Sequence, residues 1–465
     1  MNLPSESLPL PSAHYDKASK GYWFQDSKGS WMCLKEGDLV RFLSDLGYSG
    51  KPAGAEALSP AARALMKIQM EQNVDYAGPL AGYHQGLIEM EGKSVLVTDS
   101  PKIIQPVPGE FTVLQMTLFH MFGPEQLPYF EAWIKLAYES LRSGKLRSGH
   151  AVVMAGPRNS GKTLVQEIVT KVLGGRVGKP YLHMTGGSSF NSDLFGSEHL
   201  VIDDECGSTE FKSRQKLTSQ FKMIAAAGSQ HCHAKYATPL TLKPFWRLTV
   251  SVNDDPESLL VLPLIREDLA DKIMLFKITR HEMPMPTATN EERDAFWTRL
   301  MADLPGWLDH LVRWEIPEKM RANRFGVEHY HHKEIMEALE GLSPEMKLYD
   351  LLENSFGHSL NGWRGTASEL ETLLAGDSSS TRYEARKIFI FNNACARYLE
   401  RLSKKFQTII MRDGRHCNRH YWKIVFPQTR VERVQQRGTA AGNLPPNPMI
   451  GSTDAAASPT LIVAG

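Results

Sequence analysis

Residues 151–169 read AVVMAGPRNSGKTLVQEIV, and this stretch decides the fold of the chain. The run Ala151–Ala155 is apolar, as expected for a buried strand, and the residues from Leu164 onward continue as a helix. Between them lies G-x-x-x-x-G-K-T, from Gly156 to Thr163. A glycine-rich turn that joins a strand to a helix in this way predicts an α/β domain with a phosphate-binding loop.

The residue types in this loop suit a bound triphosphate. Glycines let backbone N–H groups curl around phosphate oxygens, and the start of the helix adds its partial positive charge. We expect Lys162 to reach the β- and γ-phosphates of ATP and Thr163 to offer its hydroxyl to Mg²⁺. The alternative is a turn that binds nothing. The predicted ATP-binding residues are Gly156, Pro157, Arg158, Asn159, Ser160, Gly161, Lys162, Thr163 and Leu164.

A second apolar run, Leu200–Ile202, ends in three acids, Asp203, Asp204 and Glu205. In a nucleotide-hydrolysing site, one carboxylate after a strand holds hydrated Mg²⁺ and a neighbour orients the attacking water. We expect Asp204 to hold the metal and Glu205 to orient the water, with Asp203 as the alternative metal ligand. The acids could instead be a polar cluster that ends the strand.

A third apolar strand, Leu248–Val252, is followed by Asn253. An amide at the tip of a strand beside the phosphate loop can contact the γ-phosphate and position water. Asn253-Asp-Asp-Pro256 is also a good turn sequence in its own right. The alternation of strands and helices over residues 149–282 predicts a mainly parallel sheet.

The order of these elements resembles superfamily 3 helicases, a branch of the AAA+ ATPases, and in particular primase-helicase-like proteins of phages and prophages. Gly156–Thr163 matches motif A, Leu200–Glu205 matches motif B and Leu248–Asn253 matches motif C. The resemblance implies a homo-hexameric ring that hydrolyses ATP and moves on single-stranded DNA.

The resemblance also assigns DNA contacts and an interface residue. Residues 231–244 look like the family's hairpin, with Lys235 against the DNA backbone and His233 and Lys243 as lesser candidates. Lys235 could also be an ordinary solvated lysine. A basic residue after motif C reaches the next subunit's γ-phosphate in relatives, and Arg266 or Lys272 would take this role.

The C-terminal part is rich in Lys and Arg and looks like a winged helix that contacts DNA. A protein-docking role is the alternative. We expect helices at Pro344–Glu353 and Tyr383–Lys404, a capping box at Thr366–Glu369, and a strand, turn and strand with the turn at Arg412–Arg415. The predicted DNA-binding residues of this part are Arg397, Arg401, Arg412 and Arg415.

These patterns divide the chain into segments. They are an N-terminal accessory domain (1–107), a helical collar (108–148), the ATPase core (149–282), a helical connector (283–343), the winged helix (344–427) and a disordered tail (428–465).

The 465-residue chain has a net charge of +1 and five cysteines without a CxxC pair. Its apolar runs fall short of the roughly 20 residues that cross a bilayer, so we expect a cytoplasmic protein with no membrane contact. The leading hypothesis is an ATP-driven DNA helicase or replication initiator of a mobile element. An ATP-switched DNA clamp without unwinding and a small-molecule phosphotransferase are the alternatives.

Overall fold

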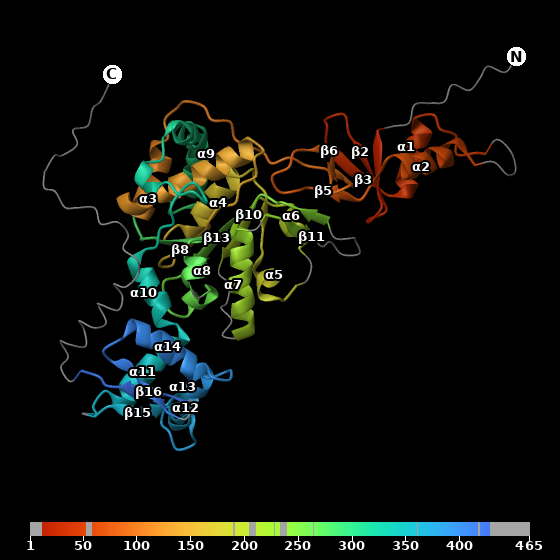
Figure 1. Cartoon of the computed structure of the whole chain (residues 1–465). Coiled ribbons are helices and arrows are strands. Elements are labelled where there is room, and N and C mark those ends of the chain that lie inside the picture. The colour runs from red at the N-terminus through yellow and green to blue at the C-terminus, as the bar shows by residue number, and fades with distance from the viewer. Residues whose placement is uncertain are drawn as a thin grey trace, which may run out of the picture. The chain divides into compact units, whose positions relative to one another are not determined.

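The computed structural model describes residues 12–52, 58–188, 191–203, 211–226, 228–232, 240–263, 265–359, 361–416 and 419–427. The chain divides into two compact units, Met1–Leu339 and Glu340–Gly465 (Figure 1). Four predicted site residues lie outside the described residues, namely Asp204, Glu205, His233 and Lys235. The predicted tail, residues 428–465, lies outside them as well.

A parallel five-stranded sheet forms the centre of the first unit, in the order β14-β8-β13-β10-β9. The prediction of a mainly parallel sheet is confirmed. Its strands are β8 (Ala151–Ala155), β9 (Val177–Gly178), β10 (His199–Asp203), β13 (Arg247–Val252) and β14 (Ile273–Lys277). Every residue of β8 and β13 is buried. β8 therefore reads as uninterrupted apolar sequence, whereas β13 also carries the buried polar residues Arg247, Thr249 and Ser251.

Helices pack against both faces of this sheet. On one face α4 (Lys162–Val172) contacts β10 and β13, and α3 (Thr112–Arg142) contacts β14. On the other, α7 (Phe211–Ala226) contacts β8 and β13. Because side chains of a strand alternate between faces, Val152 and Met154 join the core under α3 and α4.

Gly123 inside α3 has φ 68° and ψ 172° and kinks the helix within the collar. The helix α9 (Asn290–Arg313) begins at a capping box formed by Thr289 and Glu292. Its apolar face, with Leu300, Trp307 and Leu311, packs in the same core as α3. The collar and the first part of the connector therefore share one core with the sheet.

Shorter elements complete this part of the unit. They are α5 (Tyr181–Thr185), α6 (Ser192–Phe195), β11 (Gln230–Cys232), β12 (Leu240–Leu242), η1 (Ser258–Val261), α8 (Glu267–Ala270), η2 (Glu318–Met320) and α10 (Lys333–Gly341). Within the part of the chain that is described, no helix has the length and apolar character to cross a membrane.

The N-terminal region contains two small sheets, with strand orders β3-β2-β1-β4 and β5-β7-β6. The elements are β1 (Ala13–Asp16), β2 (Gly21–Gln25), β3 (Trp31–Leu34), α1 (Glu36–Asp45), α2 (Pro60–Glu71), β4 (Asn73–Val74), β5 (Tyr76–Gly78), β6 (Gly86–Met90) and β7 (Lys93–Val97).

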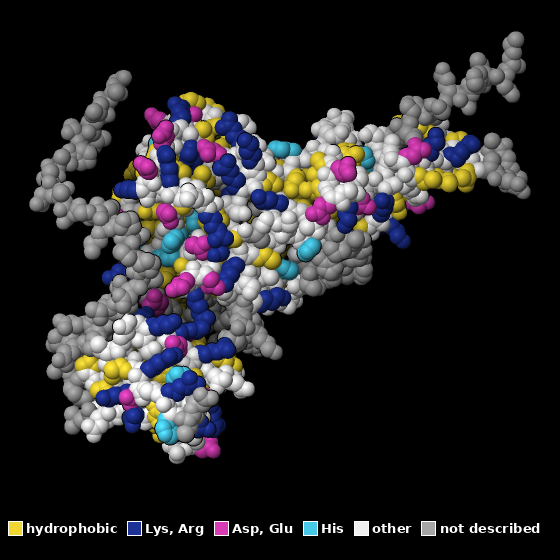
Figure 2. Space-filling model, viewed as in Figure 1, with side chains coloured by type: hydrophobic (Ala, Val, Ile, Leu, Met, Phe, Trp, Pro, Cys, Tyr) yellow, Lys and Arg dark blue, Asp and Glu magenta, His cyan; other side chains and the backbone are white. Residues whose placement is uncertain are grey.

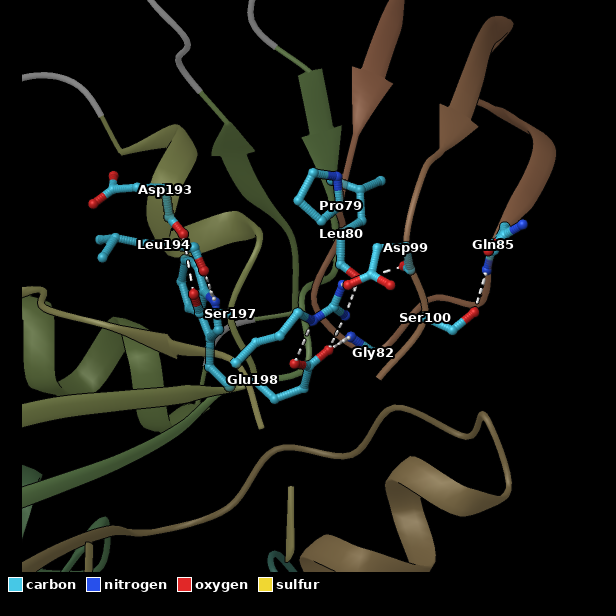
Figure 3. Close-up of polar contacts among 12 residues, drawn as sticks. Pro79, Leu80, Gly82, Gln85, Asp99, Ser100, Asp193, Leu194, Ser197 and Glu198 are labelled. Carbon is cyan, nitrogen blue, oxygen red and sulfur yellow. Dashed lines mark hydrogen bonds and ion pairs between the residues drawn. The ribbon is translucent and has the colours of Figure 1, made fainter. Parts of the chain in front are cut away.

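A buried carboxylate joins the N-terminal region to the central sheet (Figure 3). Glu198, which is 0% exposed and precedes β10, accepts hydrogen bonds from Gly82 N at 2.8 Å and from Arg176 Nε at 2.9 Å. The same guanidinium donates to the backbone oxygens of Leu80 and Asp99 at 3.1 and 3.2 Å. A fully buried carboxylate is stable only when paired and hydrogen-bonded in this way.

The second unit combines helices with an antiparallel three-stranded sheet in the order β15-β17-β16. The expected capping box of Thr366 and Glu369 is present at the start of α12. The elements are α11 (Pro344–Phe356), β15 (Trp363–Thr366), α12 (Ala367–Ala375), α13 (Arg382–Ile388), α14 (Ala394–Lys405), β16 (Ile410–His416) and β17 (Arg419–Ile424).

Two predictions for this unit are wrong. The single helix expected over Tyr383–Lys404 is two helices, α13 and α14, because Asn393 takes a left-handed backbone with φ 64° and starts a new helix. The turn expected at Arg412–Arg415 lies instead inside β16, where the pairing with β17 shifts register between these two residues. Such a bulge absorbs the turn-like residues without ending the strand.

Candidate nucleotide site

The loop between β8 and α4 needs glycine at both ends for different reasons. At Gly156 a Cβ atom would lie 2.2 Å from the backbone oxygen of Ile278, so no side chain fits. Gly161 has φ 88° and Asn159 has φ 59°, both in the left-handed region. The loop therefore turns sharply enough for α4 to begin at Lys162 with its N-terminus against the loop.

Lys162 is the buried cation of this loop, with only 8% of the residue exposed. Its Nζ donates to the backbone oxygens of Gly156 and Pro157 at 2.9 and 2.8 Å. It also lies 3.4 Å from Ser160 Oγ, and Ser160 itself is buried. A cation held by carbonyl dipoles at a helix N-terminus makes this loop strongly attractive to an anion.

The next residue connects the loop to the acidic strand. Thr163 Oγ1 donates to Asp203 Oδ2 at 3.3 Å, across 40 positions of sequence. Asp203 is the last residue of β10 and is half-buried. A hydroxyl and a carboxylate within hydrogen-bond distance of one another are oxygen ligands of the kind that Mg²⁺ prefers.

Asn253 follows the strand that lies between these two. In the ladder Val252 pairs with Ala155, and Gly156 N donates to Val252 O at 3.2 Å. On the other side of β13, Ser251 pairs with Asp203. Since parallel strands end at the same edge of a sheet, Gly156, Asn253 and Asp203 lie side by side at the carboxyl edge.

The other predicted loop residues differ in exposure. Arg158 and Asn159 are exposed, whereas Pro157 and Leu164 are half-buried. Among the described residues Arg158 has no ion pair, so its guanidinium is available beside the loop.

A buried polar network lies beneath the site and was not predicted from the sequence. The imidazole of His199 contacts Thr170 Oγ1 at 2.7 Å and Thr249 Oγ1 at 2.8 Å, and Gln166 Nε2 donates to Thr249 Oγ1 at 3.1 Å. Gln166 Nε2 also donates to Ile202 O at 3.2 Å. The network therefore joins α4, β10 and β13. Burial lowers the pKa of His199 to about 3, so the ring is neutral.

The spacing of this network was visible in the sequence only in part. Lys162, Gln166 and Thr170 recur every four residues on one face of α4. Their partners His199 and Thr249 are polar residues in otherwise apolar strands. No local sequence pattern indicates that the polar residues of α4 contact the polar residues of β10 and β13.

Apolar side chains close the other side of the loop. A Cβ atom at Gly161 would lie 2.9 Å from Met121 Cε and 3.4 Å from Met283 Cε. Thr279 N donates to Met121 O at 3.3 Å, which attaches the segment after β14 to α3. These residues come from segments far from the motif in sequence, and sequence reasoning missed them.

The two candidates for an interface cation differ. Lys272 Nζ donates to Asp271 Oδ1 at 2.5 Å and to Asp268 O at 2.7 Å, and its side chain is 12% exposed. Arg266 is exposed at the start of α8. Lys272 is therefore engaged within its own chain.

The predicted hairpin is described only in its stems. The strands β11 and β12 pair antiparallel, with Gln230 opposite Leu242 and Cys232 opposite Leu240. Lys243 follows β12 and is exposed, and its backbone oxygen accepts a hydrogen bond from the Tyr83 hydroxyl at 3.0 Å.

In the second unit, two predicted DNA-binding arginines already have ion pairs. Arg401 pairs with Glu345 and Arg412 pairs with Glu400. Arg397 is exposed and lies over the ring of Phe391 at 5.5 Å. Arg415 lies in β16 opposite His420.

Comparisons with known proteins bear on the fold. The apo structure of the NrS-1 C-terminal region (305–718) is similar with a TM-score of 0.54 at 14% identity, over 91% of this chain and 100% of that chain. An A-form apo structure of the same region gives a TM-score of 0.50 at 12% identity, over 89% and 96%.

Other matches are more distant or partial. The active helicase SCCmec type IV Cch has a TM-score of 0.28 at 12% identity, over 85% of this chain and 70% of that chain. No curated protein matches the sequence. Residues 154–263, from β8 to the segment after η1, match a family of unknown function (DUF5906). The chain thus shares its fold with the NrS-1 C-terminal region.

Proposed function

We propose that the chain is an ATPase that uses Mg²⁺·ATP at the carboxyl edge of the central sheet to move on single-stranded DNA as a homo-hexamer. The observation that carries the proposal is the contact between Thr163 and Asp203 beside the loop that holds Lys162. It brings a hydroxyl, a carboxylate and a buried ammonium together from two strand–loop segments. Asn253, on the strand between them, supplies a fourth polar group.

The described residues of the loop and of β10 suit the phosphates of ATP and Mg²⁺, which the proposal requires. The narrow loop with glycine at positions 156 and 161 suits backbone N–H contacts to phosphate, and Lys162 would exchange its carbonyl partners for phosphate oxygens. Thr163 and Asp203 would hold Mg²⁺, which supplies charge neutralisation at the phosphates when bound. The contact with Thr163 supports Asp203, the alternative metal ligand of the sequence analysis, as a metal-side acid, and Glu205 would orient the water. Asp204 and Glu205 themselves lie outside the described residues.

The DNA part of the proposal rests on three features. The strand order places a motif C-like asparagine between the other two motifs, and a hairpin follows motif B in the chain. The fold is that of the NrS-1 C-terminal region. The second unit ends in an antiparallel strand pair, β16 and β17, that follows a group of helices, and this supports a winged helix that would contact duplex DNA.

The test is hydrolysis with and without single-stranded DNA. Lys162→Ala is expected to abolish ATP turnover, whereas Lys171→Ala, at the exposed end of the same helix, keeps it. Glu205→Gln is expected to bind ATP without turnover. Lys162→Ala with unchanged hydrolysis would overturn the site.

A second measurement separates movement from clamping. Lys235→Ala is expected to keep basal hydrolysis and lose DNA stimulation and strand separation. If the unaltered chain hydrolyses ATP faster with DNA but never separates strands, it is an ATP-switched clamp. Hydrolysis by a monomer that ignores DNA would instead indicate a phosphotransferase.

A further inference from the structure

We propose that α13 and the segment that leads from it into α14 form a platform on which the bases of single-stranded nucleic acid stack. The inference rests on DNA being the partner in the proposed function, but it does not depend on ATP hydrolysis. The platform consists of Tyr383, Lys387, Phe391 and Arg397.

Tyr383 is the most exposed large apolar or aromatic side chain of the described residues, at 71%. It lies on the first turn of α13, whose Ala385 and Ile388 point into the core of the unit. The ring is therefore held by a short packed helix and has no role in that core. An exposed aromatic ring on a rigid element is well placed to stack on a planar partner.

Cations accompany the rings of this platform. Lys387 Nζ lies 4.0 Å from the centre of the Tyr383 ring, four residues along the same helix. The guanidinium of Arg397, on α14, lies 5.5 Å from the centre of the Phe391 ring. Phe391 also packs edge-on against Tyr398 in the core of the unit, which fixes its position. A cation beside an aromatic ring can contact the phosphate of a base that stacks on that ring.

These cations are available, unlike many others in the unit. Arg382 and Arg386 pair with Asp377, Arg401 with Glu345, and Lys405 with Glu340. Within the described part of the chain, Lys387, Arg397 and Lys404 have no ion pair. Lys and Arg side chains gather on the visible face of this unit (Figure 2).

The charge of the segment decides the kind of partner. Residues 382–405 hold seven Lys and Arg against two Glu, and four of the seven pair with acids outside this segment, which leaves Lys387, Arg397 and Lys404 without an ion pair among the described residues. An apolar docking surface for a protein would combine exposed Ile390 and Tyr383 without this excess of positive charge. Aromatic rings interleaved with free cations favour a polyanion with exposed planar groups, which is single-stranded nucleic acid.

The experiment measures the binding of a fluorescein-labelled oligothymidylate to the full chain by fluorescence anisotropy. It uses a Lys162→Ala background, so that the motor is off and a failure of the ATP site does not affect the result. Tyr383→Ala is expected to weaken binding about tenfold, whereas Tyr383→Phe, which keeps the ring, binds as before. Lys387→Gln is expected to reduce the slope of the logarithm of the binding constant against the logarithm of the salt concentration by about 0.7, as for the loss of one phosphate contact.

The matched control is Leu373→Ala, an equally simple loss of an exposed apolar side chain on α12. It is expected to change nothing. The proposal is wrong if Tyr383→Ala binds oligothymidylate as tightly as its parent. It is also wrong if this substitution weakens the binding of blunt duplex DNA as much as the binding of oligothymidylate. Unchanged DNA binding together with altered self-association in sedimentation would identify a protein-docking surface and also overturn the proposal.

Discussion

At the scale of single residues, the candidate site depends on contacts between side chains that are distant in sequence. Thr163 and Asp203 meet although 40 positions separate them. Lys162 is buried in its loop. Of the two candidates for an interface cation, Lys272 donates hydrogen bonds to Asp271 and Asp268 of its own chain, whereas Arg266 is exposed. Two predictions follow from these differences.

Asp203→Asn is expected to raise the Mg²⁺ concentration needed for ATP hydrolysis and to lower kcat by at least about 100-fold, because this carboxylate contacts Thr163 and is the metal-side acid of the proposed site. The measurement is a Mg²⁺ titration of turnover. Asp193→Asn, at an exposed acid of α6, is the matched control and should behave as the unaltered chain. A Mg²⁺ defect in Asp204→Asn but not in Asp203→Asn would reverse the assignment.

Arg266→Ala is expected to abolish turnover, and mixing it with Lys162→Ala subunits should restore part of the activity. In such a mixed ring, an intact loop of one subunit meets an intact Arg266 of the next. The Lys272 ammonium is held by Asp271 and Asp268 of its own chain, so Lys272→Ala mixtures should show no such recovery. Recovery with Lys272→Ala alone would identify Lys272 as the residue acting across the interface.

At the scale of elements, buried polar groups join helices and strands that the sequence alone presents separately. The network of Gln166, Thr170, His199 and Thr249 joins α4 to β10 and β13. Glu198 and Arg176 join the N-terminal region to the amino end of β10. The polar groups of both networks find their hydrogen-bond partners only once these helices and strands have packed together.

Glu198→Ala is expected to destabilise the chain by about 3–5 kcal/mol, because it leaves the Arg176 guanidinium, whose side chain is 14% exposed, without its carboxylate. The measurement is urea unfolding. Arg324→Ala removes a more exposed pair with Asp271 and should cost less than about 1 kcal/mol. A Glu198→Ala cost as small as that of Arg324→Ala would contradict the buried-pair account.

At the scale of the whole molecule, the first unit buries histidines that stay neutral. Burial lowers the pKa of His150 and His199 to about 3 and that of His331 to about 4, from an ordinary value of 6.5. Between these values and pH 6.5, the unfolded chain binds protons that the folded chain does not. Stability is therefore complete above about pH 6.5 and falls as the pH drops below it, by about 1.4 kcal/mol per pH unit for each histidine.

This pH dependence is checked by urea unfolding between neutral and mildly acidic pH. His199→Asn is expected to be less stable at neutral pH but to lose less stability on acidification than the unaltered chain. His84→Asn, at an exposed histidine, should leave the dependence unchanged. An equal slope for His199→Asn and the unaltered chain would show that His199 does not contribute.

The sequence by itself determined the strand–loop–helix at Ala151–Val169, the mainly parallel sheet and the identity of the loop residues. These follow from local rules, since glycine spacing, apolar runs and capping boxes act within a few residues. The tertiary structure alone decided that Asp203 faces Thr163, that Lys272 and Arg401 are already paired, and that Asn393 breaks a helix. Thr163 and Asp203 are 40 positions apart and Arg401 and Glu345 are 56 apart, and no local pattern encodes such contacts. Lys272 bonds to residues only one and four positions away, but several charged neighbours compete for it, and the fold decides between them.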